Sequence, residues 1–267
     1  EIVSTRVSSI KPTSDMERLN DAGGGRLDDE LLDILRSALD AWHATDGRFD
    51  IGLGAELVAA GYDRDFDELD AVDVRSAWTA SEATTSTLPA EPAAPGIPPY
   101  ELDGDLLVIR DGRRLDLGGF AKGWAADRMR DLLAAVGPCL VNIGGDIAVS
   151  PATGVEPWTI GLDVDGAVRS FEVPGGGLAT SSQDRRVWQA GADRAHHLID
   201  PRTGTSARTD VLRVTVIHDT CMEAEIWTKA LMLVGMEAAF DEAESRGLTV
   251  GLFGIDGTEC WSGSLAA

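Results

Sequence analysis

Apolar residues recur at helical spacing in several stretches of the chain. In residues 28–43 they fall three and four positions apart, which predicts an amphipathic helix. Acidic residues at its start and Gly47 after its end suit the two helix termini. The same periodicity predicts helices over 121–136, 222–234 and 237–245. The first of these three is expected to bury an apolar set: Ala125, Met129, Leu132 and Leu133.

Continuous and alternating apolar runs predict strands. Residues 139–150 indicate a buried strand interrupted by Gly144 and Gly145, and residues 211–218 indicate another strand near the end of the chain. Asp-Gly dipeptides are the usual signal for a two-residue turn, and they predict hairpins at 111–112, 165–166 and 256–257. This mixture of hairpins and helices favours an α+β fold over a purely parallel sheet.

One stretch departs from both patterns. Residues 88–100, within the segment from Leu88 to Gly104, are rich in proline and predict a surface loop. The chain has 267 residues, of which 43% are hydrophobic, so it can bury a substantial core. We expect a single domain over 1–267.

Charge narrows the classes of function. The formal net charge of −22 argues against a nucleic-acid-binding protein, which needs a basic face. A phosphate ligand would need a local group of cations, or a metal ion, to offset the acidic surroundings. No apolar run approaches the roughly 18–20 residues of a transmembrane helix.

The number and spacing of the three cysteines indicate whether the protein works in a reducing or an oxidising compartment. Cys139, Cys221 and Cys260 are widely spaced and form neither a zinc motif nor a disulfide framework. Their odd number favours a reducing compartment, and we expect a cytoplasmic protein. A membrane-anchored lipoprotein is the alternative if a segment was trimmed ahead of Glu1.

Two glycine-rich turns are candidate ligand sites. Gly118, Gly119 and Lys122 precede a predicted helix, whose N-terminus attracts anions. Taken alone, this segment favours a structural turn. Gly144 and Gly145 allow a flat ligand to approach or simply bend a strand, and the carboxylate that follows them at position 146 needs a buried partner.

Two polar segments follow. Residues 180–186 supply hydroxyls and two arginines, and residues 196–203 contain adjacent histidines within a turn-forming sequence. On the predicted helix 222–234, Glu225, Thr228 and Lys229 share one face. An i, i+4 ion pair is the commoner outcome for such a face. The alternative is an oxygen ligand set for Mg²⁺.

These segments together resemble the ApbE family of FAD-dependent flavin transferases. The likeness is carried by "LDLGGFAKGWAADR", "VNIGGDI", "ATSS", "HHLIDPRTG" and "CMEAEIWTKALMLVG", and earlier by "KPTSDMERLN" and "TDGRFDIGLG". It covers about residues 11–261, and the family's first strand is expected to lie upstream of Glu1. The resemblance implies a mixed-sheet α+β architecture related to the T-fold, with helices packed on the sheets and an FAD cleft between two halves.

The resemblance also implies a reaction. With Mg²⁺, family members transfer the FMN part of FAD to a Thr or Ser of a target flavoprotein and release AMP. FAD and an acceptor flavoprotein are therefore the expected partners. Two other functions remain open: an FAD-binding or storage protein, and an FAD pyrophosphatase that yields FMN and AMP without a protein acceptor.

Site residues follow from the same resemblance. His197, Lys122 and Glu225 are the expected catalytic residues. The expected FAD contacts are Asn20, Gly118, Gly119, Lys122, Gly144, Gly145, Asp146, Thr180, Ser181, His197 and Asp200. The expected metal ligands are the carbonyl of Ala121 and the side chains of Glu225 and Thr228.

Two positions depart from the family pattern. Glu225 stands where the family usually has Asp, and Lys229 stands where it has a Thr ligand. An ammonium group beside Mg²⁺ repels it. Either Thr228 supplies the missing oxygen, which we prefer, or Lys229 itself replaces the cation and weakens the dependence on metal.

Overall fold

A computed structural model of the chain describes Arg6 and residues 14–64, 66–69, 96–152, 154, 156–164, 167–190 and 193–263. Its helices are α2 (Asp15–Ala22), α3 (Asp29–Ala44), α4 (Gly54–Ala59), the short 3-10 helix η1 (Phe66–Glu68), α6 (Ala121–Ala134), α7 (Cys221–Met232) and α8 (Met236–Arg246). Within these ranges, every helix is too short or too polar to cross a lipid bilayer.

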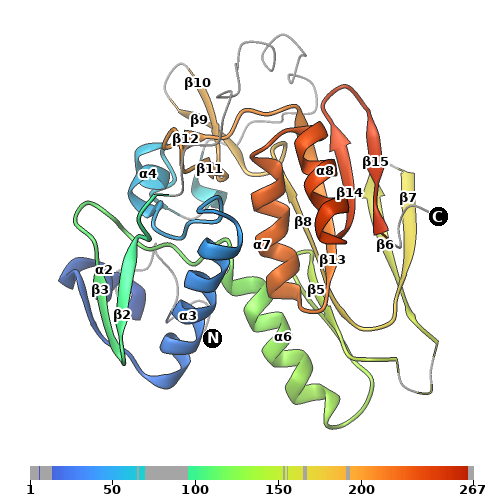
Figure 1. The fold of residues 1–267 in the computed structure, drawn as a ribbon, viewed down its shortest axis with the longest axis horizontal. Coiled ribbons are helices and arrows are strands. Elements are labelled where there is room, and N and C mark those ends of the chain that lie inside the picture. The colour runs from blue at the N-terminus through green and yellow to red at the C-terminus, as the bar shows by residue number, and fades with distance from the viewer. Residues whose placement is uncertain are drawn as a thin grey trace.

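A six-stranded antiparallel sheet forms the larger layer. Its order is β15-β14-β13-β8-β5-β4, made of β15 (Glu259–Trp261), β14 (Thr249–Gly254), β13 (Val211–His218), β8 (Gly176–Ser182), β5 (Asp146–Val149) and β4 (Leu140–Ile143). Helix α7 packs on β8 and β13, α8 packs on β14, and α6 packs on β4 and β5 (Figure 1). The helices therefore cover this sheet, as the α+β prediction requires.

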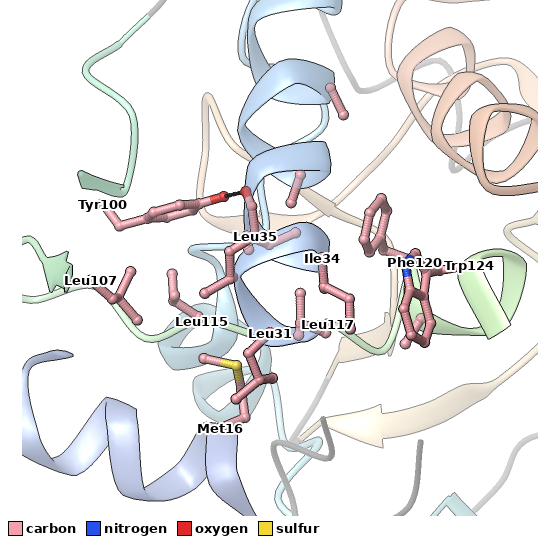
Figure 2. Packing of buried hydrophobic residues seen from close by; sticks show 14 of the residues in the cluster. Met16, Leu31, Ile34, Leu35, Tyr100, Leu107, Leu115, Leu117, Phe120 and Trp124 are labelled. Carbon is pink, nitrogen blue, oxygen red and sulfur yellow. Dashed lines mark hydrogen bonds between the residues drawn. The ribbon is translucent and has the colours of Figure 1, made fainter. Parts of the chain in front are cut away.

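The N-terminal layer is smaller, and its apolar core continues into α6 and α7 through Phe120, Trp124 and Ile226. Three strands pair in the order β1-β3-β2, namely β1 (Gly24–Arg26), β3 (Leu106–Ile109) and β2 (Tyr100–Asp103). Asp28 caps α3 by accepting a hydrogen bond from the Leu31 amide. The apolar stripe of α3 then packs into a cluster with Leu107, Leu115 and Leu117, and the Tyr100 hydroxyl donates to the Leu35 carbonyl (Figure 2).

Three small hairpins complete the fold. They pair β6 (Trp158–Val164) with β7 (Ala167–Val173), β9 (Val187–Ala190) with β10 (Asp193–His196), and β11 (Ile199–Asp200) with β12 (Thr205–Ser206). The turn predicted at 165–166 joins β6 to β7 but lies outside the described residues. The hairpin predicted at 256–257 is confirmed between β14 and β15.

Helices α6 and α7 and strand β8 meet at one point without side chains between them. A Cβ atom on Gly123 would lie 2.8 Å from the Cys221 carbonyl oxygen, and one on Gly177 would lie 2.1 Å from the Cys221 amide nitrogen. Glycine is therefore required at both positions. Asp127 accepts hydrogen bonds from the amides of Cys221 and Met222, which ties α6 to the N-terminus of α7.

Three sequence predictions were wrong in detail. The hairpin predicted at 111–112 has its turn at Gly104 instead, between β2 and β3. Asp111 and Gly112 are followed by irregular chain that contacts the start of α4, and not by a second strand of a hairpin. Residues 100–103 therefore form a strand and not the end of the proline-rich loop, most of which lies outside the described residues. The pair Gly144-Gly145 is the turn of the β4–β5 hairpin, with both residues at positive φ, and does not interrupt one strand.

The inner face predicted for α6 was confirmed for Ala125 and wrong for its other three residues. Met129, Leu132 and Leu133 are 48%, 76% and 45% exposed, so they face solvent. The buried residues of α6 are in its first two turns and are mostly small: Ala121, Gly123, Trp124, Ala125 and Ala126. Small side chains let α6 approach α7 closely, and this packing outweighs the apolar spacing further along the helix.

Candidate active site

A cavity of about 640 Å³ opens where the start of α6, the β4–β5 turn and strands β6, β8 and β13 surround one face of α7. A pocket of this size is within the range of cofactor sites. It brings together ten of the predicted site residues: Gly118, Gly119, Lys122, Gly144, Gly145, Asp146, Thr180, Ser181, His197 and Glu225. Segments spread over more than a hundred residues of sequence therefore share one cavity.

Buried charges form the floor of the pocket. Glu225 is 1% exposed, and its Oε1 lies 3.3 Å from Lys122 Nζ and 3.2 Å from Lys229 Nζ. Its Oε2 accepts a hydrogen bond of 2.9 Å from the Gly123 amide. Lys122 also pairs with Asp146, which is buried at the start of β5. The buried carboxylates are thus compensated by two ammonium groups and a backbone amide, as buried charges require.

The pKa values of these groups reflect this arrangement. Burial lowers the pKa of Lys122, but Glu225 and Asp146 outweigh it and hold the value above the ordinary 10.5. Burial, together with repulsion from Glu225, raises the pKa of Asp146 above 3.8. Burial lowers the pKa of Lys229 despite the attraction of Glu225. Lys122 is therefore the firmly charged member of the cluster.

His197 faces the cavity as a neutral ring. Burial, with His196 and nearby cations acting in the same direction, holds the pKa of His197 well below 6.5. Its Nδ1 atom is buried and has no hydrogen-bond partner among the described residues. In its neighbour His196, Nε2 donates to the Ala207 carbonyl and Nδ1 accepts from the Leu198 amide, so that ring is used for structure. Of these two adjacent histidines, His197 lines the cavity and His196 does not.

Arginines give the pocket a positive surplus. Arg185, Arg186 and Arg213 join the two lysines along its lining, against the carboxylates of Asp146, Asp163 and Glu225. Within the described part of the chain, Arg185 and Arg186 are exposed and form no ion pair. Five basic side chains against three acidic ones, in a chain of net charge −22, favour an anionic ligand here.

Apolar side chains also line the cavity. Ile147, Ile160, Leu162 and Leu178 line it from β5, β6 and β8. A Cβ atom on Gly144 or Gly145 would meet no atom within 4 Å, so the turn between β4 and β5 leaves open space beside these side chains. The pocket therefore combines an apolar surface with a cationic one, as suits a ligand with an aromatic ring system and a phosphate group.

Four predicted site residues do not line the cavity. The Asn20 amide both donates to and accepts from the backbone of Leu115, which holds α2 in place. Asp200 forms a bidentate ion pair with Arg202. Thr228 is fully buried, and Ala121 is the first residue of α6. Contacts of these residues with a ligand stay predictions.

The residues at α7 do not fit a bound Mg²⁺. The Thr228 hydroxyl donates to the Glu225 carbonyl at 2.8 Å and shares a hydrogen bond of 2.7 Å with Ser181. Both carboxylate oxygens of Glu225 are engaged, one with Gly123 and one with two lysines. Mg²⁺ needs near-octahedral oxygen ligands. A metal ion held by the expected ligands Ala121, Glu225 and Thr228 would therefore lie beside the ammonium group of Lys229, which already contacts Glu225.

Sequence reasoning missed several lining residues. Asn142, Phe66 and Arg213 line the cavity but were not proposed as site residues. A signal for Arg213 existed, because it is a charged residue within an apolar strand. It is 5% exposed and donates to the Asp163 carbonyl at 3.1 Å. Phe66 carries no such signal.

Comparison with known proteins gives one consistent result. A model described as "ApbE family" matches residues 1–252. Over 139 residues the chain is 35% identical to an FAD:protein FMN transferase of Klebsiella pneumoniae, across 49% of this chain and 42% of that protein. Over 230 residues it is 27% identical to the FAD:protein FMN transferase of Salmonella typhimurium, across 82% of this chain and 63% of that protein. The chain thus spans less than two thirds of both relatives.

A solved structure supports the fold. The crystal structure of an ApbE protein from Thermotoga maritima matches with a TM-score of 0.80 at 24% identity, covering 97% of this chain and 85% of that one. This likeness confirms the mixed arrangement of helices and sheets.

Proposed function

The chain belongs to the ApbE family, and from this premise we propose that it transfers FMN from FAD to a hydroxyl group of a Thr or Ser in a flavoprotein, with release of AMP. The observation that carries the proposal is the pocket, whose lining combines five basic side chains with aliphatic ones. FAD has the matching parts: a flat ring system and a diphosphate.

We assign the diphosphate of FAD to the cationic side. Lys122 is fixed between Asp146 and Glu225, and the guanidinium groups of Arg185 and Arg186, which form no ion pair with a described residue, can donate to phosphate oxygens. The flavin ring then lies against the apolar residues of β5, β6 and β8. Orientation and neutralisation of charge are the main sources of catalysis in phosphoryl transfer.

The reaction exchanges the phosphoanhydride bond of the FMN phosphorus for a phosphoester bond. The acceptor hydroxyl oxygen forms a bond to that phosphorus, and the bond from phosphorus to the oxygen bridging to AMP breaks. AMP leaves with the bridging oxygen, and its new charge lies among the arginines. The hydroxyl proton passes to His197, which is neutral at pH 7 and has a nitrogen without a partner.

No step is assigned to a metal ion. Family members use Mg²⁺, according to the resemblance, but the donor groups around Glu225 are already paired with lysines. The chain's own residues supply binding, orientation and proton transfer.

The test is co-incubation of the purified chain with FAD and a flavoprotein that another family member modifies. Covalent flavin is detected by in-gel fluorescence after denaturation, and AMP is measured in the supernatant. We expect fluorescence on the acceptor and an equal amount of AMP. Replacement of the acceptor Thr or Ser by Ala should abolish both.

Two other results would reject transfer as the function. FMN and AMP released without an acceptor would identify a pyrophosphatase, and FAD recovered intact would identify a storage protein. Within the transferase reading, His197→Gln should slow transfer about hundredfold while FAD still binds. Unchanged transfer in that variant would remove His197 from its proposed role.

A further inference from the structure

Lysine is rare in this chain and concentrated in the pocket. The sequence has three lysines, Lys11, Lys122 and Lys229, while the remaining basic residues are arginines. Two of the three line the cavity on either side of Glu225. A compact ammonium group differs from a guanidinium in being a point charge that fits a small space. The choice of lysine at both positions indicates a spatial requirement at the pocket floor.

The side chain of Lys229 occupies a space prepared for it. A Cβ atom on Gly119 would lie 2.9 Å from Lys229 Cε, so the glycine turn before α6 leaves room for the lysine alone. Lys229 Nζ lies 3.2 Å from Glu225 Oε1 and 3.3 Å from the Glu225 carbonyl oxygen. Two oxygens of one residue therefore hold the ammonium at the floor of the pocket, where it lines the cavity.

Charges in the pocket favour a diphosphate without a metal. Five basic side chains and three carboxylates line the cavity, and Asp184 pairs with Arg213 from outside the lining, so a surplus of positive charge remains. The diphosphate of FAD carries two negative charges at neutral pH. A divalent cation added to the same space would leave an excess of positive charge and would compete with Lys122 and Lys229 for the single oxygen Glu225 Oε1.

We propose that the ammonium group of Lys229 takes the place of a divalent cation in this chain, so that FAD binds and reacts without metal. Lys122 and Lys229 hold the diphosphate from two sides of Glu225, and the arginines hold it from the pocket mouth. The part of this inference that concerns reaction rests on the proposed transfer of FMN. The part that concerns binding does not.

The test is the affinity for FAD, measured by titration calorimetry in excess EDTA and in excess Mg²⁺. We expect the dissociation constants of the unmodified chain to agree within about twofold. A difference larger than this, in favour of Mg²⁺, would overturn the proposal. This comparison needs no variant, so it stands even if a substitution at Lys229 impairs folding.

Two variants of Lys229 test the proposal in different ways. One should lose FAD affinity, and the other should gain a response to Mg²⁺. Lys229→Met keeps the length of the side chain without its charge, and we expect it to weaken FAD binding about tenfold or more in both buffers. Lys229→Thr removes the ammonium and adds an oxygen, and Mg²⁺ should tighten its FAD binding by about fivefold or more. Unchanged binding in Lys229→Met, or no response to Mg²⁺ in Lys229→Thr, would contradict the proposed substitution of cation by lysine.

A matched control separates local from overall charge. Arg26→Gln removes one positive charge at an exposed ion pair with Asp105, on the N-terminal layer. Its FAD affinity should equal that of the unmodified chain in both buffers. The transfer assay then distinguishes the two proposals: transfer that needs Mg²⁺ rejects this inference alone, whereas metal-independent FAD binding without any transfer rejects the proposed function alone.

Discussion

Helices α3 and α7 contrast in what they bury. α3 has 16 residues, and the six that are buried are apolar and lie on one face. α7 has 12 residues, and nine are buried, including Glu225 and Thr228. Both begin with a capping side chain. The difference shows that α3 exists to close a core, whereas α7 carries charge into the interior and depends on neighbouring elements to compensate it.

The contrast predicts that substitutions in the two helices differ in their effects on stability and on the pocket. A change in α3 should affect stability and leave the pocket intact, because its apolar face packs into the core and none of its residues lines the cavity. A change at Glu225 should affect both, because its partners come from α6 and from its own helix. Four experiments test this separation.

The largest effect is expected for Glu225→Gln. The substitution keeps the shape but leaves the two lysines without their shared anion, and breaking a buried pair costs about 3–5 kcal/mol. We expect this loss in the free energy of unfolding, measured in urea, together with loss of FAD binding. Glu244→Gln, at an exposed position of α8, is the control and should change stability by less than about 0.5 kcal/mol. Equal stability of the two variants would show that Glu225 is not a structural charge.

Ile34→Ala should come next. Ile34 is fully buried in α3, and truncation of such a side chain costs about 2–5 kcal/mol. FAD affinity, measured below the unfolding transition, should remain unchanged. A clear loss of FAD affinity in this variant would break the distinction between the core helix and the pocket helix.

The capping residues should behave alike in the two helices. Thr220 accepts a hydrogen bond from the Glu223 amide, and Asp28 accepts one from the Leu31 amide. Thr220→Ala and Asp28→Ala should each lower the free energy of unfolding by about 1 kcal/mol. Thr220→Ser and Asp28→Asn keep an acceptor and should recover most of it. A loss confined to one helix would show that the contrast begins at the N-termini.

The smallest effect is expected for the ion pair between His218 and Glu223 at the start of α7, whose contribution to stability depends on pH. The contact of His218 Nδ1 with the Glu223 carboxylate raises the pKa of His218 above 6.5, and the same contact lowers the pKa of Glu223 below 4.5. The pair therefore stabilises the fold most between about pH 4.5 and 6.5, and the contribution is lost as pH rises through the folded-state pKa of His218. The difference in unfolding free energy between the unmodified chain and His218→Gln should fall from about 0.5 kcal/mol at pH 6 to near zero at pH 8.5. A difference that is flat with pH would contradict this pairing.

Local signals predicted the regular elements well where one rule dominated. The stripe of α3, the strand 211–218 and the turn at 256–257 follow directly from spacing and turn chemistry. The errors lie where packing of distant segments decided the outcome. Met129 and Leu132 have helical spacing, but α6 faces inward through Gly123 and Ala126, whose small size allows contact with α7.

The pocket shows the same limit. Motifs resembling those of the family led to Lys122, Asp146, His197 and Glu225, and the fold brings these residues to one cavity. Spacing within one segment could not reveal that Lys229 shares Glu225 with Lys122, since that contact joins α6 to α7. Nor could it show that the Asn20 amide is occupied by the backbone of Leu115.

The junction at Cys221 has a consequence for motion. Because the backbones of α6, α7 and β8 touch there, none of the three can slide or rotate past the others without collision. We therefore expect any movement on ligand binding in the exposed segment bearing Arg185 and Arg186, where Arg186 has a φ of +51°. The floor of the pocket is therefore rigid, and adjustment to an acceptor is expected at its rim.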